Sequence, residues 1–124
     1  MHEHAIVQNI VETLATSAKK ENILPGQVRE VVMKVGELEF HTEAAFRQTF
    51  EVLIRGTLLE GATLNLSVLR PMLKCPDCGF SGPCREGEAD PHSPMPCGEC
   101  PSCGKVVPIT GGRGVEGLEL VLKE

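Results

Sequence analysis

The sequence contains no tryptophan and no tyrosine, and only four phenylalanines. A buried core must therefore be built mainly from valine, leucine and isoleucine, which belong to the 41% of residues that are hydrophobic. No uninterrupted apolar run approaches the roughly 20 residues that a membrane-spanning helix needs. The amino-terminus also lacks a basic segment followed by an apolar one, so we predict no secretory signal and expect a reducing, cytoplasmic environment.

Positive charge is also scarce, because 12 lysines and arginines face 17 aspartates and glutamates, for a net charge of −5. The segment 74–113, which holds every cysteine, has four basic and five acidic residues. Nucleic-acid binding needs a basic face that neutralises phosphates, so DNA and RNA are not predicted partners. The sequence also shows no HExxH motif, no phosphate-binding loop and no nucleophile with an evident base, so an enzyme is not predicted.

The six cysteines contain a repeated pattern. C-P-x-C-G occurs at Cys75–Gly79 and again at Cys100–Gly104, with 21 residues between the two cysteine pairs. Two cysteines separated by two residues can point both sulfur atoms at one ion, and proline and glycine favour the tight turn that this requires. Four thiolates form the tetrahedral ligand set of structural zinc. The pattern therefore predicts one Zn²⁺ bound by Cys75, Cys78, Cys100 and Cys103.

A site with four ligands leaves two of the six cysteines over, Cys84 and Cys97. Cys97 and Cys100 also form a CxxC pair, but only Cys100 and Cys103 repeat the first pattern with glycine after the second cysteine. We expect Cys84 and Cys97 to be free thiols or alternative ligands. A disulfide framework is the competing interpretation, and it is disfavoured because no secretory signal precedes the segment.

The chain starts with Met1, His2 and Glu3. A free α-amine, the amide nitrogens that follow and an imidazole can wrap around one ion, and a square-planar nitrogen set suits Ni²⁺ or Cu²⁺ better than Zn²⁺. The alternative is that His2 is merely a polar residue on a frayed terminus. His4 could compete for such a site or complete it.

Hydrophobic periodicity predicts a helix from Ala5 to about Glu21, a strand from Val28 to Val35 and a connector from Glu37 to His41. Thr42 is a plausible N-cap for a second helix that runs to about Arg55. Alternation predicts strands at Thr63–Leu69 and Gly117–Lys123. The interval between the cysteine pairs is rich in proline and is predicted to be a loop without regular structure.

The order of these elements predicts an α+β fold, with two helices on one face of a three-stranded sheet and an inserted zinc-ribbon-like module. The predicted boundaries are a nickel-binding α/β domain formed by residues 1–73 and 114–124, and a zinc-binding domain formed by residues 74–113.

Several short motifs occur in a specific order: Met1-His2-Glu3, Val35-Gly36-Glu37-Leu38, Gly56-Thr57, Glu60-Gly61-Ala62-x-Leu64 and the paired cysteines. In this order the chain resembles the HypA/HybF family of hydrogenase nickel-incorporation proteins. The resemblance implies a nickel metallochaperone that delivers Ni(II) to the [NiFe]-hydrogenase large-subunit precursor together with the HypB GTPase. Some members also serve urease maturation.

The same resemblance implies a nickel site at Met1, His2 and Glu3, with His2 as the key side chain, and a zinc site at the four cysteines. His92 is expected either to complete the nickel coordination or to lie in solvent, and His41 is interpreted as an ordinary connector residue. The alternative function is a zinc-stabilised protein-interaction adaptor without its own nickel site, for which His2 would be dispensable.

Overall fold

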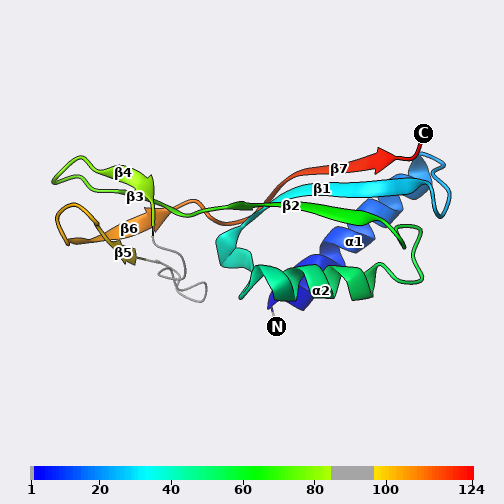
Figure 1. The fold of residues 1–124 in the computed structure, drawn as a ribbon, viewed down its shortest axis with the longest axis horizontal. Helices are drawn as coiled ribbons and strands as arrows, with labels where there is room; N and C mark the ends of the chain where they lie inside the picture. The colour runs from blue at the N-terminus through cyan, green and yellow to red at the C-terminus, as the bar shows by residue number, and fades with distance from the viewer. Residues whose placement is uncertain (1, 85–96) are drawn as a thin grey trace.

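The computed structural model of the chain describes residues 2–84 and 97–124, and in the first helix it describes side chains from His4 onward. The chain forms two lobes that lie end to end along the long axis of the molecule (Figure 1). We call residues 2–69 and 115–124 the α/β lobe, and the described residues 72–84 and 97–110 the cysteine lobe. No helix among the described residues is long and apolar enough to cross a membrane.

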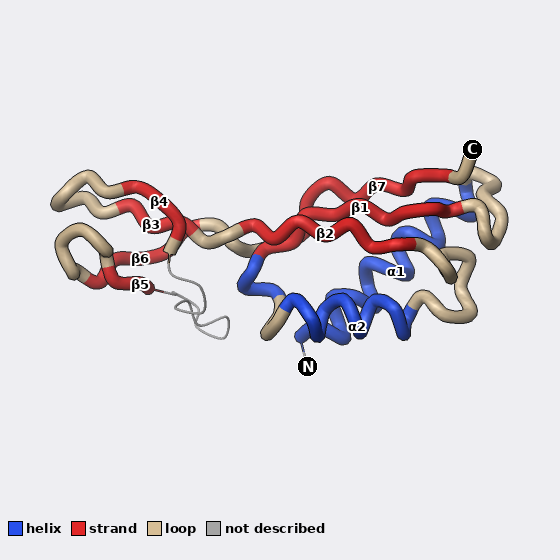
Figure 2. The backbone as a smooth tube through the Cα atoms, viewed as in Figure 1, coloured by secondary structure: helices blue, strands red, loops and turns tan. Residues whose placement is uncertain are grey.

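The α/β lobe contains a three-stranded sheet and two helices. Strand β1 (Val28–Gly36) is central, with β2 (Thr63–Leu69) parallel on one side and β7 (Val115–Leu122) antiparallel on the other. Helices α1 (His2–Lys20) and α2 (Glu43–Leu53) cover the same face of this sheet (Figure 2). The predicted fold class, two helices on one face of a three-stranded sheet with an inserted module, is therefore confirmed.

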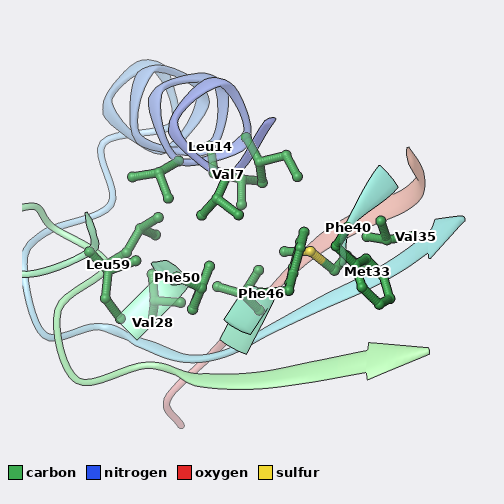
Figure 3. Packing of buried hydrophobic residues seen from close by; sticks show 13 residues of the cluster. Val7, Leu14, Val28, Met33, Val35, Phe40, Phe46, Phe50 and Leu59 are labelled. Carbon is green, nitrogen blue, oxygen red and sulfur yellow. The ribbon is translucent and has the colours of Figure 1, made fainter. Parts of the chain in front are cut away.

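The core of this lobe lies between the helices and the sheet (Figure 3). Val31 of β1 lies opposite Leu64 of β2 and Leu120 of β7, so aliphatic side chains form continuous rows across the sheet. Phe46 and Phe50 of α2 are almost completely buried. The thirteen buried members of this core are Val7, Ile10, Val11, Leu14, Val28, Val31, Met33, Val35, Phe40, Phe46, Phe50, Ile54 and Leu59.

The boundaries of the elements differ from the predictions by a few residues. Helix α1 begins at His2 instead of Ala5, so the expected free terminus is helical from its second residue. Thr42 is the predicted N-cap of α2, and its Oγ1 accepts a hydrogen bond from the Ala45 amide at 3.0 Å. The predicted connector contains a short 3₁₀ helix, η1 (Glu37–Glu39).

The cysteine lobe is a four-stranded antiparallel sheet in the order β4-β3-β6-β5. Its strands are β3 (Met72–Lys74), β4 (Ser81–Pro83), β5 (Cys97–Glu99) and β6 (Val106–Thr110). The prediction of an interval without regular structure was therefore wrong at Ser81–Pro83 and Cys97–Glu99. These strands are too short to be seen in the local sequence, and they form because β3 and β6 supply hydrogen-bonding partners.

The two lobes are connected by residues 70–71 and 111–114, where the backbones pass very close together. A Cβ atom on Gly36, at the end of β1, would lie only 2.2 Å from the carbonyl oxygen of Gly112. Only glycine fits at this position, because any side chain would collide with the returning chain. The domain boundaries near residues 73 and 114 stay a prediction.

Candidate metal centre

The first C-P-x-C-G pattern forms a closed turn. The amide of Cys75 donates to the carbonyl of Phe80 at 2.9 Å, and the amide of Gly79 donates back to the carbonyl of Cys75 at 3.0 Å. Gly79 has a φ of 78°, in the left-handed region that side chains disfavour. The glycine after the second cysteine therefore closes the turn, with Cys75 and Cys78 on it.

The second pattern repeats this geometry. Cys100 donates to the carbonyl of Lys105 at 2.7 Å, Gly104 donates to the carbonyl of Cys100 at 2.8 Å, and Gly104 has a φ of 79°. Two local sequences of the same type thus give two equivalent turns. Each presents its cysteines to the other, at facing ends of two hairpins.

The structure brings the four predicted sulfur atoms together. Sγ of Cys75 lies 3.7 Å from Sγ of Cys103, and Sγ of Cys78 lies 3.5 Å from Sγ of Cys100. All four ligand atoms lie within 4.8 Å of one another. Four sulfurs at zinc–sulfur distances of about 2.3 Å in a tetrahedron would be about 3.8 Å apart, so the observed spacing fits a tetrahedral Zn²⁺.

Within each turn, one cysteine is buried and the other is exposed. Cys75 and Cys100, the first cysteine of each turn, are buried at 2% and 1% exposure, whereas Cys78 and Cys103 are exposed. With one buried and one exposed thiol from each side, the cluster straddles the edge of the small core. A closed four-ligand site leaves no position for a substrate, which favours a structural over a catalytic metal.

The environment shifts the pKa values of Cys75, Cys100 and Cys103 in different directions. Amide groups of Cys78 and Asp77 donate to Cys75 and lower the pKa of its thiol. Burial acts to raise the pKa of Cys100, but the amides of Cys103 and Ser102, together with hydrogen bonds to the sulfurs of Cys78 and Cys103, outweigh burial and bring it to about 7.

The pKa of Cys103 shifts in the opposite direction. The amide of Lys105 acts to lower its pKa, but desolvation and the neighbouring sulfur atoms prevail and raise the pKa of Cys103 to about 12. Adding a last negative charge to a thiolate cluster is costly, and a divalent cation would remove that cost.

An ion pair also joins the two turns. Nζ of Lys105, after the second turn, contacts the carboxylate of Asp77 inside the first turn. The sequence analysis did not identify this pair. The only signal is an aspartate in the variable position of the first pattern and a lysine directly after the second, two patterns that a common metal would bring face to face.

Cys84 and Cys97 lie outside the four-sulfur group. Cys84 is 2% exposed and belongs to the buried core of the cysteine lobe, while Cys97 is exposed at the start of β5. In the described part of the chain, Cys75, Cys78, Cys100 and Cys103 form the one group of metal-binding side chains that could hold an ion.

The predicted nickel ligands are only partly described. The backbone of His2 and Glu3 forms the first turn of α1, whereas Met1 and His92 lie outside the described residues. His4 is exposed in α1, and His41 is exposed between η1 and α2. The role of each of these residues stays a prediction.

Comparison with known proteins identifies the family. The family described as "Hydrogenase/urease nickel incorporation, metallochaperone, hypA" matches residues 1–121. A hydrogenase maturation factor HypA from Geobacter metallireducens is 36% identical over 124 residues, covering 100% of this chain and 96% of that protein. One from Methanocaldococcus jannaschii is 32% identical over 116 residues, covering 91% of this chain and 90% of the relative.

Solved structures show the same fold at lower identity. The solution structure of the Ni metallochaperone HypA from Helicobacter pylori superposes with a TM-score of 0.53 at 23% identity, covering 99% of this chain and 100% of that one. A second solution structure of HypA protein superposes with a TM-score of 0.56 at 23% identity, covering 98% and 97%. Since the family matches nearly the full length, the chain belongs to the HypA family of nickel-incorporation metallochaperones.

Proposed function

We propose that this protein binds Ni(II) at its amino-terminus and delivers it to the large-subunit precursor of [NiFe]-hydrogenase. The observation that carries the proposal is the match of residues 1–121 to a nickel-incorporation family. The geometry also supports separate sites for the structural metal and the transported metal. The four-cysteine cluster fits a closed structural site, which leaves the metal cargo to residues elsewhere, and Met1, His2 and Glu3 are the proposed ligands.

The resident metal of the cysteine cluster is proposed to be zinc. When bound, it would supply the positive charge that lets all four thiols ionise, and Cys75, Cys78, Cys100 and Cys103 would hold it. Among the described residues, the core of the cysteine lobe consists of six buried side chains of the lobe, three of them cysteines, and Leu38 of η1. A lobe of this size usually needs a metal to fold, and structural zinc contributes about 10–16 kcal/mol in small zinc-binding peptides.

The position of the amino-terminus suits a carrier that must release its cargo. His2 and Glu3 belong to the first turn of α1, where backbone amides have no partner within the helix. The same end carries a partial positive charge, which opposes a bound cation. Nickel is therefore held through deprotonated nitrogens and the Glu3 carboxylate, and protonation of these ligands on acidification favours release.

The partners follow from the family rather than from contacts in the structure. The proposed partners are the HypB GTPase, the hydrogenase precursor and, for members that serve urease, urease maturation proteins. The proposed location is the cytoplasm, where thiols stay reduced and available for a metal. In this role the protein binds and transfers an ion and catalyses no reaction.

The experiment is a Ni²⁺ titration of tag-free, zinc-loaded protein, compared with His2→Ala and with His4→Ala as a matched control from the same helix. We expect His2→Ala to lose tight nickel binding and to keep its zinc, because the two metals use separate ligands. His4→Ala should bind nickel as the unmodified protein does.

Two other outcomes would contradict the proposal. Equal nickel binding by the unmodified protein and His2→Ala would move the site to other histidines or to the surplus cysteines. Failure of both to bind nickel would favour the second candidate, a zinc-stabilised adaptor. The closed four-sulfur cluster supports that candidate, since it stabilises a lobe without offering an open coordination position.

A further inference from the structure

The two outer strands of the α/β sheet differ in how well their free edges are protected. Strand β7 is irregular, because two register shifts interrupt its pairing with β1 and Gly117 within it has a φ of 60°. Its exposed side chains include Glu116 and Glu119. Bulges and charged side chains are features by which proteins prevent another strand from pairing with an edge. The edge of β7 is therefore protected.

Strand β2, at the other edge, has none of these features. Its seven residues pair with β1 in one continuous register without a shift. The strand contains no charged residue, no proline and no glycine. Among the described residues no further strand pairs with its outer side, and Figure 2 shows β2 along the rim of the sheet. It is therefore a regular edge to which another strand can pair.

The pairing of β1 identifies the backbone groups on the free side of β2. The amide of Gly36 donates to the carbonyl of Gly114 beside β7, so the even-numbered residues of β1 face β7 and Met33 faces β2. Met33 lies opposite Leu66. In a parallel ladder a residue bonds to the two neighbours of the residue opposite it, so the amide and carbonyl of Leu66 itself point away from β1.

The free side of β2 therefore carries the amides and carbonyls of Leu64, Leu66 and Val68. A contact agrees with this assignment, since Nη1 of Arg47 on α2 donates to the carbonyl of Leu64 at 3.3 Å. In the described part of the chain, Leu66 and Val68 make no backbone hydrogen bond outside the sheet. Their polar groups are available to a strand that lies beside β2.

The side chains of these three residues are half-buried. Leu64, Leu66 and Val68 pack against the core on the face that the helices cover. A strand added beside β2 would cover them further and extend that core. On the opposite face, Asn65 and Ser67 are exposed and uncharged. The edge thus offers apolar contacts on one face and neutral polar contacts on the other.

The order of residues in β2 is complementary to itself. If two copies pair in antiparallel orientation about a two-fold axis at Leu66, each Leu64 lies opposite Val68 of the other copy. This register also brings the free amides and carbonyls of both strands together, as an antiparallel ladder requires. On the other face Asn65 lies opposite Ser67, a polar pair that suits cross-strand contact. No like charges meet, because the strand has no charge.

We propose that the free edge of β2 binds a second copy of this chain, so that the sheets of two α/β lobes join into one. The contact is isologous, with the same residues used by both copies. One strand pair with its flanks forms a small interface, so the dimer dissociates on dilution. The inference uses only the sheet edge and does not rest on the proposed nickel function.

The test begins with sedimentation velocity of the full, zinc-loaded chain under reducing conditions, over a wide range of concentrations. The apparent mass should rise from the 13.4 kDa of the monomer towards twice that value. Hydrogen exchange should slow with concentration at the amides of Leu66 and Val68, but not at those of Asn65 and Ser67, which already bond to β1. A protein that stays monomeric throughout would overturn the proposal and leave this edge to a strand of another protein.

Two double variants test the register, because each changes only exposed positions. Asn65→Lys/Ser67→Lys places like charges opposite each other in two pairs across the axis and should weaken the dimer by about tenfold. Asn65→Lys/Ser67→Glu places opposite charges there and should tighten it by a similar factor. Since the two variants are expected to act in opposite directions, a general loss of stability cannot produce both results.

Glu116→Gln/Glu119→Gln is the matched control at the other edge of the sheet. Both glutamates are exposed, and their replacement changes the net charge by the same two positive units as the two introduced lysines. This control should dimerise as the unmodified protein does. A dimer of equal affinity in the unmodified chain and in both β2 variants would overturn the proposal, because the copies would then meet through another surface.

Discussion

Cys75 and Cys103 are separated by 28 positions in the sequence, yet their sulfur atoms lie 3.7 Å apart. One is the first cysteine of the first turn and the other is the second cysteine of the second turn. The same crossed relationship holds for Cys78 and Cys100 at 3.5 Å. Each turn therefore contributes one sulfur to each of the two cross-turn contacts, so loss of any one thiol should break the tetrahedral set.

The first prediction concerns the choice of ligands. Cys103→Ser should lower the zinc content and raise the rate at which a chelator removes zinc, because the tetrahedral set loses one thiolate. Cys97→Ser is the matched control, since Cys97 lies outside the four-sulfur group, and it should keep one zinc per chain. Metal analysis after dialysis measures both. Full zinc in Cys103→Ser with loss in Cys97→Ser would assign the ligands differently.

The second prediction concerns protons released on zinc binding. At pH 7 the thiol of Cys103, with a pKa of about 12, is protonated, and Cys100, with a pKa of about 7, is partly protonated. Zinc must displace these protons, so its apparent affinity should rise as the pH increases from 6 to 8. Calorimetry in buffers with different ionisation enthalpies counts the protons. An affinity that does not change over this range would contradict the prediction.

The third prediction concerns the close contact between the lobes. Gly36→Ala places a methyl group against the backbone of Gly112 and should lower the free energy of unfolding by about 3 kcal/mol or more, above the usual range for overpacking. Gly26→Ala is the control, because Gly26 has a φ of 85° with open space around it and should cost only about 1–2 kcal/mol. Denaturant unfolding compares the two. Equal costs would mean that the close approach of Gly36 and Gly112 tolerates an added side chain.

The fourth prediction concerns the start of α2. Thr42→Ala removes the Oγ1 atom that accepts the amide of Ala45 and should cost about 1 kcal/mol of stability. Thr42→Ser keeps an acceptor at the same place and should restore most of this loss. Thermal unfolding at constant zinc content measures the difference. If the serine variant is as unstable as the alanine variant, the methyl group of Thr42 stabilises the protein and the hydroxyl does not.

Much of the fold could be predicted because its signals are local. The aliphatic alternation of Thr63–Leu69 predicts a strand with the bounds that the structure shows for β2. The N-cap at Thr42 depends on an interaction three residues away. The two cysteine turns each need only five residues, with a glycine that adopts a positive φ. Patterns of this length are visible without any knowledge of the rest of the chain.

Other features depend on partners that are distant in the sequence. Strands β4 and β5 have three residues each and exist only because β3 and β6 pair with them. Gly36 has no local need for glycine, since its φ of −63° suits any residue. The need arises from Gly112, which lies 76 positions further along the chain and passes beside it.

By itself, the sequence determined the two main helices and the three strands of the α/β lobe, the two cysteine turns and the family, because each depends on residue types at short, fixed spacings. Only the tertiary structure decided where the side chains of η1 and of the residue after it are buried. Leu38 and Phe40 have the same parity in the sequence, yet they enter different cores. Burial depends on which surfaces meet when two lobes pack together, and no short stretch of sequence contains both surfaces.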